Sequence, residues 1–201
     1  NQIPDKKIRE KAEIGVVNGL AVYGANIGVL MEIEATAKKV SHRSGILKVT
    51  GIVEEEEISN SNRKIKRKST AYSSIQNVLT VLNNIFDLEC ENYDIHINIP
   101  GGMPVDGPSA GITITTALLS LITNKTIKKS FAMTGELSLT GKVLAIGGLR
   151  EKVVAAKRNK ITHIIFPKAN ERDLEEIPEI VKKGIKFHPV STMNEVIDLV
   201  F

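Results

Sequence analysis

Cysteine, tryptophan and long apolar runs are all scarce in this sequence. Its 201 residues include one cysteine and no tryptophan, and aromatic residues make up only 4%. The single thiol, Cys90, cannot form a disulfide within the chain, which favours a reducing compartment. Aromatic side chains are too few to stack on the bases of a single-stranded nucleic acid. No apolar run approaches the roughly 18 residues of a membrane-spanning helix, and no basic-then-apolar leader opens the sequence, so we expect a soluble domain.

An excess of charge of one sign is also missing. The formal net charge is +4, with acidic and basic residues mixed along the chain, so the charge does not demand a nucleic-acid partner. Metal-ligating side chains are sparse as well, because the histidines are scattered and no His-Glu-x-x-His or Cys/His cluster occurs. We therefore expect no metal site. The four histidines are His42, His96, His163 and His188.

Apolar residues are plentiful, at 42%, and their spacing predicts an interleaved α/β domain. The first half shows glycine-punctuated strands over 14–34, a strand over 46–53, an amphipathic helix over 75–86 and an alternating strand over 93–99. The charged stretch 54–68 can be an RNA-binding arm, but a solvated loop with oppositely charged flanks is favoured. In the second half, helices alternate with strands, which implies at least some parallel pairing. The expected helices span 109–123, 149–158, a stretch near 171 and 193–201, and the strands span 131–139, 142–146, 163–166 and 185–188.

One serine lies where a Pro/Gly turn should meet a helix. In the segment PVDGPSAG at 104–111, Pro108 suits the first helical position and Ser109 falls in the first turn. Free backbone N–H groups and the positive end of the helix dipole gather there, so the N–H groups of Ser109 and Ala110 can hold a developing oxyanion. Ser109 is a candidate nucleophile, and an ordinary helix start after a turn is the alternative.

A serine nucleophile needs a base that is unprotonated near neutral pH, and Lys152 is the candidate. On a helix from 149 to 160, Lys152 lies between Ala155 and Ala156 on the packed side, near Leu149. Desolvation and the positive end of the helix dipole both lower the pKa of a lysine from its usual value of about 10.4. The alternative is a lysine whose stem lies along the domain edge and whose amine reaches water.

Two further residues can support this pair. Asp106 can accept a hydrogen bond from Lys152 or cap the helix, and the two roles are compatible. Thr134 can orient the lysine amine through its hydroxyl, with an ordinary strand threonine as the alternative.

Three separated motifs closely resemble the proteolytic domain of Lon proteases. They are PVDGPSAG at 104–111, MTGE at 133–136 and GKVLAIGGLREK at 141–152, and the match continues in order from about residue 15 to the last helix. The resemblance implies that Ser109 is the nucleophile, Lys152 the general base, and Asp106 and Thr134 the supporting acidic residue and threonine. It also implies an α/β fold with mixed sheets, similar to the ribosomal protein S5 domain 2-like fold.

Lon-like proteases are ATP-dependent hexamers in which an AAA+ motor feeds damaged or regulatory proteins to the proteolytic sites. The resemblance therefore implies a proteolytic domain at 14–201 and a linker at 1–13 to an upstream ATPase region. It implies no cofactor for this domain, with ATP and Mg serving only the AAA+ region, and unfolded or damaged proteins as substrates. The implied location is cytoplasmic; tethering of an archaeal-type parent to the cytoplasmic face of the cell membrane is the alternative.

Two other classes of function compete with a peptidase. A phosphate-binding enzyme would use the Gly/Ser-rich loop before a helix to hold a nucleotide phosphate, which explains Ser109 but leaves Lys152 without a role. A catalytically silent, ring-forming module would need neither side chain. Tight ATP binding would favour the first, and labelling of Ser109 by an acylating inhibitor would exclude the second.

Overall fold

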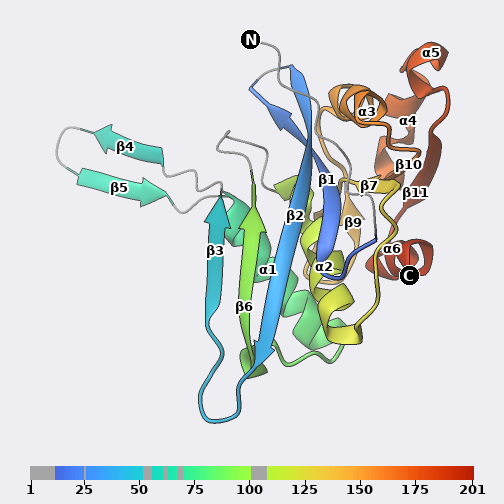
Figure 1. Ribbon diagram of the computed structural model, residues 1–201. Helices are drawn as coiled ribbons and strands as arrows, with labels where there is room; N and C mark the ends of the chain where they lie inside the picture. Colours follow the sequence, from blue (N-terminus) through green and yellow to red (C-terminus); the bar gives the residue numbers. More distant parts are fainter. Residues whose placement is uncertain (1–11, 25, 52–55, 61–62, 68–69, 101–107) are drawn as a thin grey trace.

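A seven-stranded mixed sheet is the centre of the fold (Figure 1). The computed structural model describes residues 12–24, 26–51, 56–60, 63–67, 70–100 and 108–201. The strands of this sheet are β1 (Val16–Tyr23), β2 (Ile27–Lys39), β3 (Leu47–Gly51), β6 (Tyr93–Ile99), β7 (Phe131–Met133), β10 (His163–Pro167) and β11 (Lys186–Val190). They lie in the order β11-β10-β7-β1-β2-β6-β3. Strands β11, β10, β7 and β1 run parallel to one another, and β6 runs parallel to β3. Strand β2, between β1 and β6, is antiparallel to both. The predicted α/β fold with mixed sheets is confirmed.

Helices pack on the sheet through two apolar cores. The α-helices are α1 (Thr70–Ile85), α2 (Gly111–Thr123), α3 (Leu149–Arg158), α4 (Glu171–Glu175), α5 (Glu179–Lys182) and α6 (Met193–Val200), and the 3-10 helices are η1 (Cys90–Asn92), η2 (Pro108–Ala110) and η3 (Lys168–Asn170). Side chains of α1, α2 and α6 belong to the first core, and side chains of α3 belong to the second.

Strands β1 and β2 contribute to both cores because successive side chains of a strand point to opposite faces. Val17 and Ile33 are register partners that belong to the first core, and Leu20 and Leu30 are register partners that belong to the second. Strand β1 and the first half of β2 are therefore buried on both faces, which explains their mostly apolar sequence. The helix that carries Lys152 thus lies on a sheet whose other face holds α2, the helix that follows Ser109.

The charged stretch predicted to be a loop contains a hairpin instead. Strands β4 (Glu56–Asn60) and β5 (Arg63–Arg67) pair antiparallel, and the hairpin projects from the rest of the molecule at the left of Figure 1. The register sets Glu56 opposite Arg67 and Glu57 opposite Lys66 along the backbone.

The strand predicted over 131–139 is also wrong in its extent, because the chain leaves the central sheet after β7. Strand β8 (Glu136–Leu137) pairs with β9 (Val143–Leu144) in a separate two-stranded sheet. Thr134 and Gly135 form the break between β7 and β8. The Gly135 N–H donates to the carbonyl of Ser109 (2.9 Å) rather than to a neighbouring strand. An added Cβ on Gly135 would lie 2.9 Å from side-chain atoms of Ile112 and Val143, so the break passes where only glycine fits.

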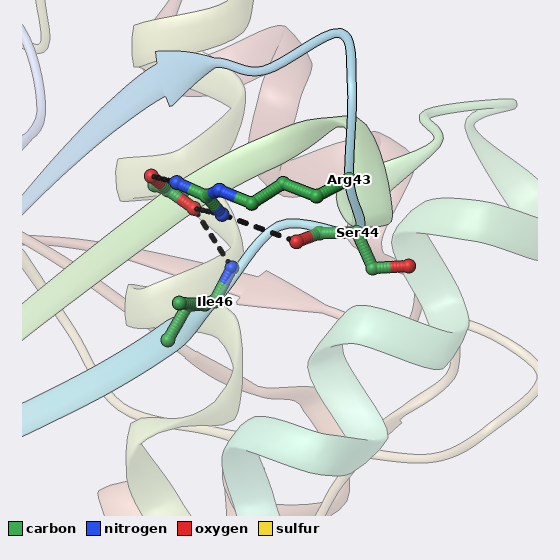
Figure 2. Close-up of polar contacts among 4 residues, drawn as sticks. Arg43, Ser44 and Ile46 are labelled. Carbon is green, nitrogen blue, oxygen red and sulfur yellow. Dashed lines mark hydrogen bonds and ion pairs between the residues drawn. The ribbon is translucent and has the colours of Figure 1, made fainter.

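A charged contact holds the connection between β2 and β3 (Figure 2). Arg43 donates to both carboxylate oxygens of Asp94, at 2.8 Å and 2.6 Å, and to the carbonyl of Ser44. The backbone N–H of Ile46 donates to the same carboxylate at 2.9 Å. These contacts hold the pKa of Asp94 well below its usual range, at about 2, chiefly through the hydrogen bond from Arg43. A bidentate guanidinium–carboxylate pair thereby joins the connection to strand β6.

Candidate active site

Lys152 is among the largest fully buried side chains of the described residues, with 0% exposure. It lies in the first turn of α3, whose buried side chains are Leu149, Lys152, Val153, Ala155 and Ala156. This is the face that the helical spacing predicted, and the neighbouring Arg150, Lys157 and Arg158 are exposed. The alternative of a lysine whose amine reaches water is therefore wrong.

The start of α3 fits closely against the sheet. Gly148, directly before the helix, has a φ of 69°, a left-handed conformation that glycine adopts without steric cost, and the N–H of Lys152 donates to its carbonyl at 3.0 Å. On strand β2, an added Cβ at Gly28 would lie 1.8 Å from the carbonyl oxygen of Glu151. The first turn of α3 thus rests directly on the backbone of β2, which places the buried side chain of Lys152 beside the strands.

Thr134 accepts a hydrogen bond from the amine of Lys152. The Nζ of Lys152 donates to the Oγ1 of Thr134 at 3.0 Å, and both side chains are 0% exposed. Thr134 directly follows β7, and its own N–H donates to the carbonyl of Ile165 in β10 at 3.1 Å. The strand break described above therefore has a chemical consequence: it fixes a hydroxyl group against a buried amine.

Ser109 lies in η2, next to the same strand break. It is 2% exposed, and its carbonyl accepts the N–H of Gly135 (2.9 Å), while the carbonyl of Gly135 accepts the N–H of Ile112 at 3.2 Å. The two-residue segment 134–135 thus contacts Lys152 through the Thr134 side chain and Ser109 through the Gly135 backbone. The structure brings Thr134 and Lys152 into direct contact. Ser109 is hydrogen-bonded to Gly135, the residue that follows Thr134.

The backbone around Ser109 forms the start of α2. Ala110 is the cap residue of α2 and has no side-chain cap hydrogen bond, and Gly111 begins the helix. An added Cβ at Gly111 would lie 2.8 Å from the backbone nitrogen of Leu137, so this start packs closely on β8. The N–H groups of Ser109 and Ala110 lie at this positive end of the helix dipole. Asp106 lies outside the described residues, so its predicted supporting role stays a prediction.

Among the described residues, no group of three or more His, Cys, Asp or Glu side chains could hold a metal ion. Cys90 is buried and free, and burial raises the pKa of its thiol, as expected of an unreactive structural cysteine.

His163 and His188, which the sequence analysis treated as scattered, are in contact. The Nδ1 of His163 lies 2.9 Å from the Nε2 of His188, and both rings stack on Phe131. Burial lowers the pKa of both imidazoles, and Lys186 and Lys128 lower it further. The parallel pairing of β10 and β11 creates this contact, and the only sequence signal for it is one histidine on each of two strands that become neighbours.

Asn170 is a second group that sequence analysis missed. Its side chain, 3% exposed, contacts the backbone of Ile146, just ahead of α3. An asparagine directly before a helix is usually a cap, so the sequence offered no signal for this longer contact.

The structure is therefore an α/β domain in which a buried lysine and a serine are hydrogen-bonded to two consecutive residues, Thr134 and Gly135. A sequence profile described as the Lon protease (S16) C-terminal proteolytic domain matches residues 2–201. The chain belongs to this family.

Individual relatives agree with the family match. The chain is 44% identical to Lon protease 2 of Bacillus subtilis (strain 168) over 195 residues, which are 96% of this chain and 34% of the relative. It is 49% identical to Lon protease of Borrelia duttonii (strain Ly) over 188 residues, 93% of this chain and 22% of the relative. It is 37% identical to the mitochondrial Lon protease homolog of Oryza sativa subsp. indica over 197 residues, 98% of this chain and 19% of the relative. The chain thus spans about a fifth to a third of the length of these relatives. In the part of the chain that the structure describes, no helix is both long enough and apolar enough to cross a membrane.

Proposed function

We propose that this chain is the proteolytic part of an ATP-dependent serine protease, in which Ser109 is the nucleophile and Lys152 the general base. The observation that carries the proposal is the complete burial of Lys152, with its amine on Thr134 and with Ser109 bonded to the adjacent Gly135. Membership of the Lon proteolytic-domain family supports the same assignment.

The surroundings of Lys152 suit a base. Complete burial opposes the ammonium form because an ion loses its hydration, and this component acts to lower the pKa of a lysine. The position in the first turn of α3 acts in the same direction, since the N-terminal end of a helix carries partial positive charge. Thr134 accepts a hydrogen bond from the amine and so directs it without adding a negative charge that would favour the ammonium form. These features support a lysine that is neutral at working pH.

The proposed reaction has two stages. Lys152, as the free amine, takes the proton of the Ser109 hydroxyl while the oxygen attacks the peptide carbonyl, and the N–H groups of Ser109 and Ala110 hold the oxyanion. Lys152 then gives the proton to the leaving amine, and the C–N bond breaks. In the second stage, Lys152 takes a proton from water and the hydroxide attacks the acyl carbon. The ester bond between this carbon and the Ser109 oxygen then breaks, Lys152 returns the proton to that oxygen, and the carboxylic acid product leaves. Asp106 is proposed to orient Lys152.

The experiment that tests the assignment is covalent labelling of Ser109. Incubation with a β-lactone should add the mass of the inhibitor to Ser109, since the serine oxygen opens the lactone ring and forms an ester. Ser109→Ala and Lys152→Ala should abolish both labelling and peptide cleavage while the far-ultraviolet circular dichroism stays that of the wild type. Labelling of Lys152→Ala at the wild-type rate would refute the proposed base. Absence of labelling in the wild type would favour a silent module, and tight ATP binding by this chain would favour a phosphate-binding enzyme.

The rest of the proposal concerns the complete protein. We propose that residues 14–201 form the proteolytic domain, that residues 1–13 link it to an AAA+ ATPase region, and that the whole assembles as a hexamer acting on unfolded or damaged proteins. The relatives are Lon proteases about three to five times the length of the matched segment, which supports a further region in the parent. ATP and Mg would serve only that region, and the proposed location is the cytoplasm. Stimulation of protein degradation by ATP in the parent protein, lost in Ser109→Ala, is the corresponding test.

A further inference from the structure

Asn170 lies at a junction between two segments that are distant in sequence. It ends the short helix η3, directly after β10, and its side chain is 3% exposed. As the residue before α4 it makes no side-chain cap hydrogen bond to that helix. Its side-chain amide instead makes hydrogen bonds with the backbone of Ile146 and with the side chain of Asp173.

The side-chain amide of Asn170 is hydrogen-bonded to both the backbone N–H and the backbone carbonyl of Ile146. The N–H of Ile146 donates to Oδ1 at 3.0 Å, and Nδ2 donates to the carbonyl of Ile146 at 2.8 Å. The second N–H of Nδ2 is used too, because Nδ2 also donates to a carboxylate oxygen of Asp173 at 2.7 Å. A carboxylate in this position could accept the Ile146 N–H but could donate no hydrogen bond. An aliphatic side chain could neither accept nor donate one. The contact therefore selects a side-chain amide.

Ile146 belongs to a short segment with little structure of its own. Residues 145–148 lie between β9 and α3 outside any helix or strand. Two of them are glycines, and Gly147 has no atom within 4 Å of an added Cβ. Glycine-containing segments have many accessible backbone conformations, so an external contact is required to choose one. The paired hydrogen bonds from Asn170 supply that contact at Ile146, three residues before the first residue of the helix.

The direction of the first turn of α3 depends on this segment. Lys152 is the fourth residue of α3, and its N–H donates to the carbonyl of Gly148, the last residue of the segment. A displacement of residues 146–148 therefore shifts the start of the turn that carries Lys152, while the later residue Ala156 belongs to the second core. The Nζ of Lys152 donates to the Oγ1 of Thr134 at 3.0 Å, and the proposed proton transfer needs this amine within reach of Ser109, so small movements of this turn would alter the site.

We propose that Asn170 is a positioning residue for Lys152, which acts by fixing the Ile146 peptide ahead of α3. The inference rests on the proposed function, since it matters only if Lys152 is the base. Asn170 touches neither the substrate nor the reacting atoms. Its effect is on the geometry of proton transfer, which falls steeply with misplacement of the groups involved.

The test compares Asn170→Ala with a matched control at the other end of the same helix. Asn159, at the end of α3, is also buried and donates from Nδ2 to the carbonyl of Ala155 at 2.8 Å. Asn159→Ala thus removes a buried asparagine that directly follows α3 and bonds to its last turn, at the end of the helix away from residues 146–148. The full chain in each form is labelled with the β-lactone at several concentrations, which separates the maximal rate constant of labelling from the half-saturating concentration.

For Asn170→Ala, we expect the maximal rate constant to fall by about ten- to a hundredfold at an unchanged half-saturating concentration, because binding is preserved and proton transfer is not. The pH at which the rate is half-maximal should move upward, toward that of a solvated lysine, as water reaches the amine. Asn159→Ala should keep the wild-type rate and pH profile. Equal rates and profiles for the two variants would overturn the inference.

A second variant covers the case in which Asn170→Ala does not fold. Asn170→Asp keeps the size and the acceptor for the Ile146 N–H but loses both donated hydrogen bonds, and we expect it to lower the rate as well. Wild-type kinetics for Asn170→Asp would also overturn the inference. If the wild type itself is not labelled at Ser109, the proposed function fails, an outcome distinct from either result for Asn170.

Discussion

At the scale of single residues, Lys152 brings an amine into the interior of the protein, where a charged group is costly. An apolar side chain of similar length would fill the same space without any need for a partner. The sequence retains lysine at this position, and the hydroxyl of Thr134 is placed to receive it. If Lys152 is the proposed base, this arrangement gives up stability for a reactive group, as functional sites commonly do.

Lys152→Met should therefore abolish labelling of Ser109 while leaving the protein at least as stable as the wild type. Methionine is flexible, similar in length and free of the desolvation cost of an amine. Urea unfolding followed by circular dichroism measures the free energy of unfolding. A large loss of stability in Lys152→Met would show that the ammonium ion is paired in the folded state and would argue against a neutral lysine.

Thr134 allows a finer comparison at the same scale. Thr134→Val keeps the shape and removes the acceptor for the lysine amine, so we expect slower labelling of Ser109 and a loss of stability of about 1–3 kcal/mol. Thr134→Ser keeps the hydroxyl and should retain most of the labelling rate. Kinetics of the two variants side by side give the contribution of the hydroxyl. Equal rates would mean that Thr134 has only a structural role.

At the scale of secondary-structure elements, two polar contacts join neighbouring strands of the sheet and titrate in different ranges of pH. The Arg43–Asp94 pair ties the β2–β3 connection to β6, and the His163–His188 pair ties β10 to β11. The first depends on a carboxylate that stays ionised, and the second on imidazoles that do not both carry a proton at the shared contact.

The Asp94 contact predicts a loss of stability in acid. Its pKa is lowered to about 2 in the folded state from an ordinary 3.8, so the stabilisation is complete above that ordinary value and is lost as the pH falls toward 2. Asp94→Asn removes the titrating group and should flatten the decrease in thermal midpoint over this range. Arg43→Gln should flatten it too, because the carboxyl then returns toward its ordinary pKa. An unchanged slope in both variants would contradict the assignment.

The histidine pair also predicts a loss of stability on acidification, but at a higher pH than the Asp94 contact. Burial lowers the pKa of both rings from 6.5, so protonation favours the unfolded chain. The stabilisation from the neutral pair is thus complete above pH 6.5 and decreases as the pH falls from there toward the lowered folded-state values. His188→Gln keeps a hydrogen-bonding group near the Nε2 position and tolerates a protonated His163, so the thermal midpoint should depend less on pH between 7 and 5. An unaltered dependence would contradict this role for the pair, and His42→Gln, on the exposed turn after β2, serves as the control.

At the scale of the whole molecule, the two apolar cores share β1 and β2, and neither core can lose these strands without the other. We expect Leu20→Ala, in the second core, and Ile33→Ala, in the first, each to destabilise one common unfolding transition by about 2–5 kcal/mol. Circular dichroism follows the helices and strands, and fluorescence of the three tyrosines, which include Tyr23 at the end of β1, follows side-chain packing. Two separate transitions in either variant would show that the cores unfold independently.

The parts of this fold that sequence predicts well are those set by local periodicity. The spacing of Leu149, Lys152, Val153 and the two alanines gave the bounds of α3 and the buried face of Lys152, because a helix repeats every 3.6 residues whatever it packs against. The alternation in 93–99 likewise predicted β6.

The parts that sequence did not predict depend on contacts between distant segments. Alternation continues through 131–139, so nothing local marks the break at Thr134 and Gly135, which exists because Ser109 binds the Gly135 N–H. The His163–His188 contact requires knowledge that β10 and β11 are neighbours. The use of Asn170 depends on the path of a glycine-containing segment 24 residues earlier in the chain. Family resemblance named Ser109, Lys152, Asp106 and Thr134, but their roles stay predictions until the variants are measured.

The shared segment 134–135 also bears on thermal motion within the site. Lys152 and Ser109 approach from different helices, yet both are bonded to adjacent residues of one short piece of backbone. When β7 fluctuates, this piece carries both partners with it in the same direction. The distance between the amine and the serine is therefore expected to vary less than the position of either group in the molecule.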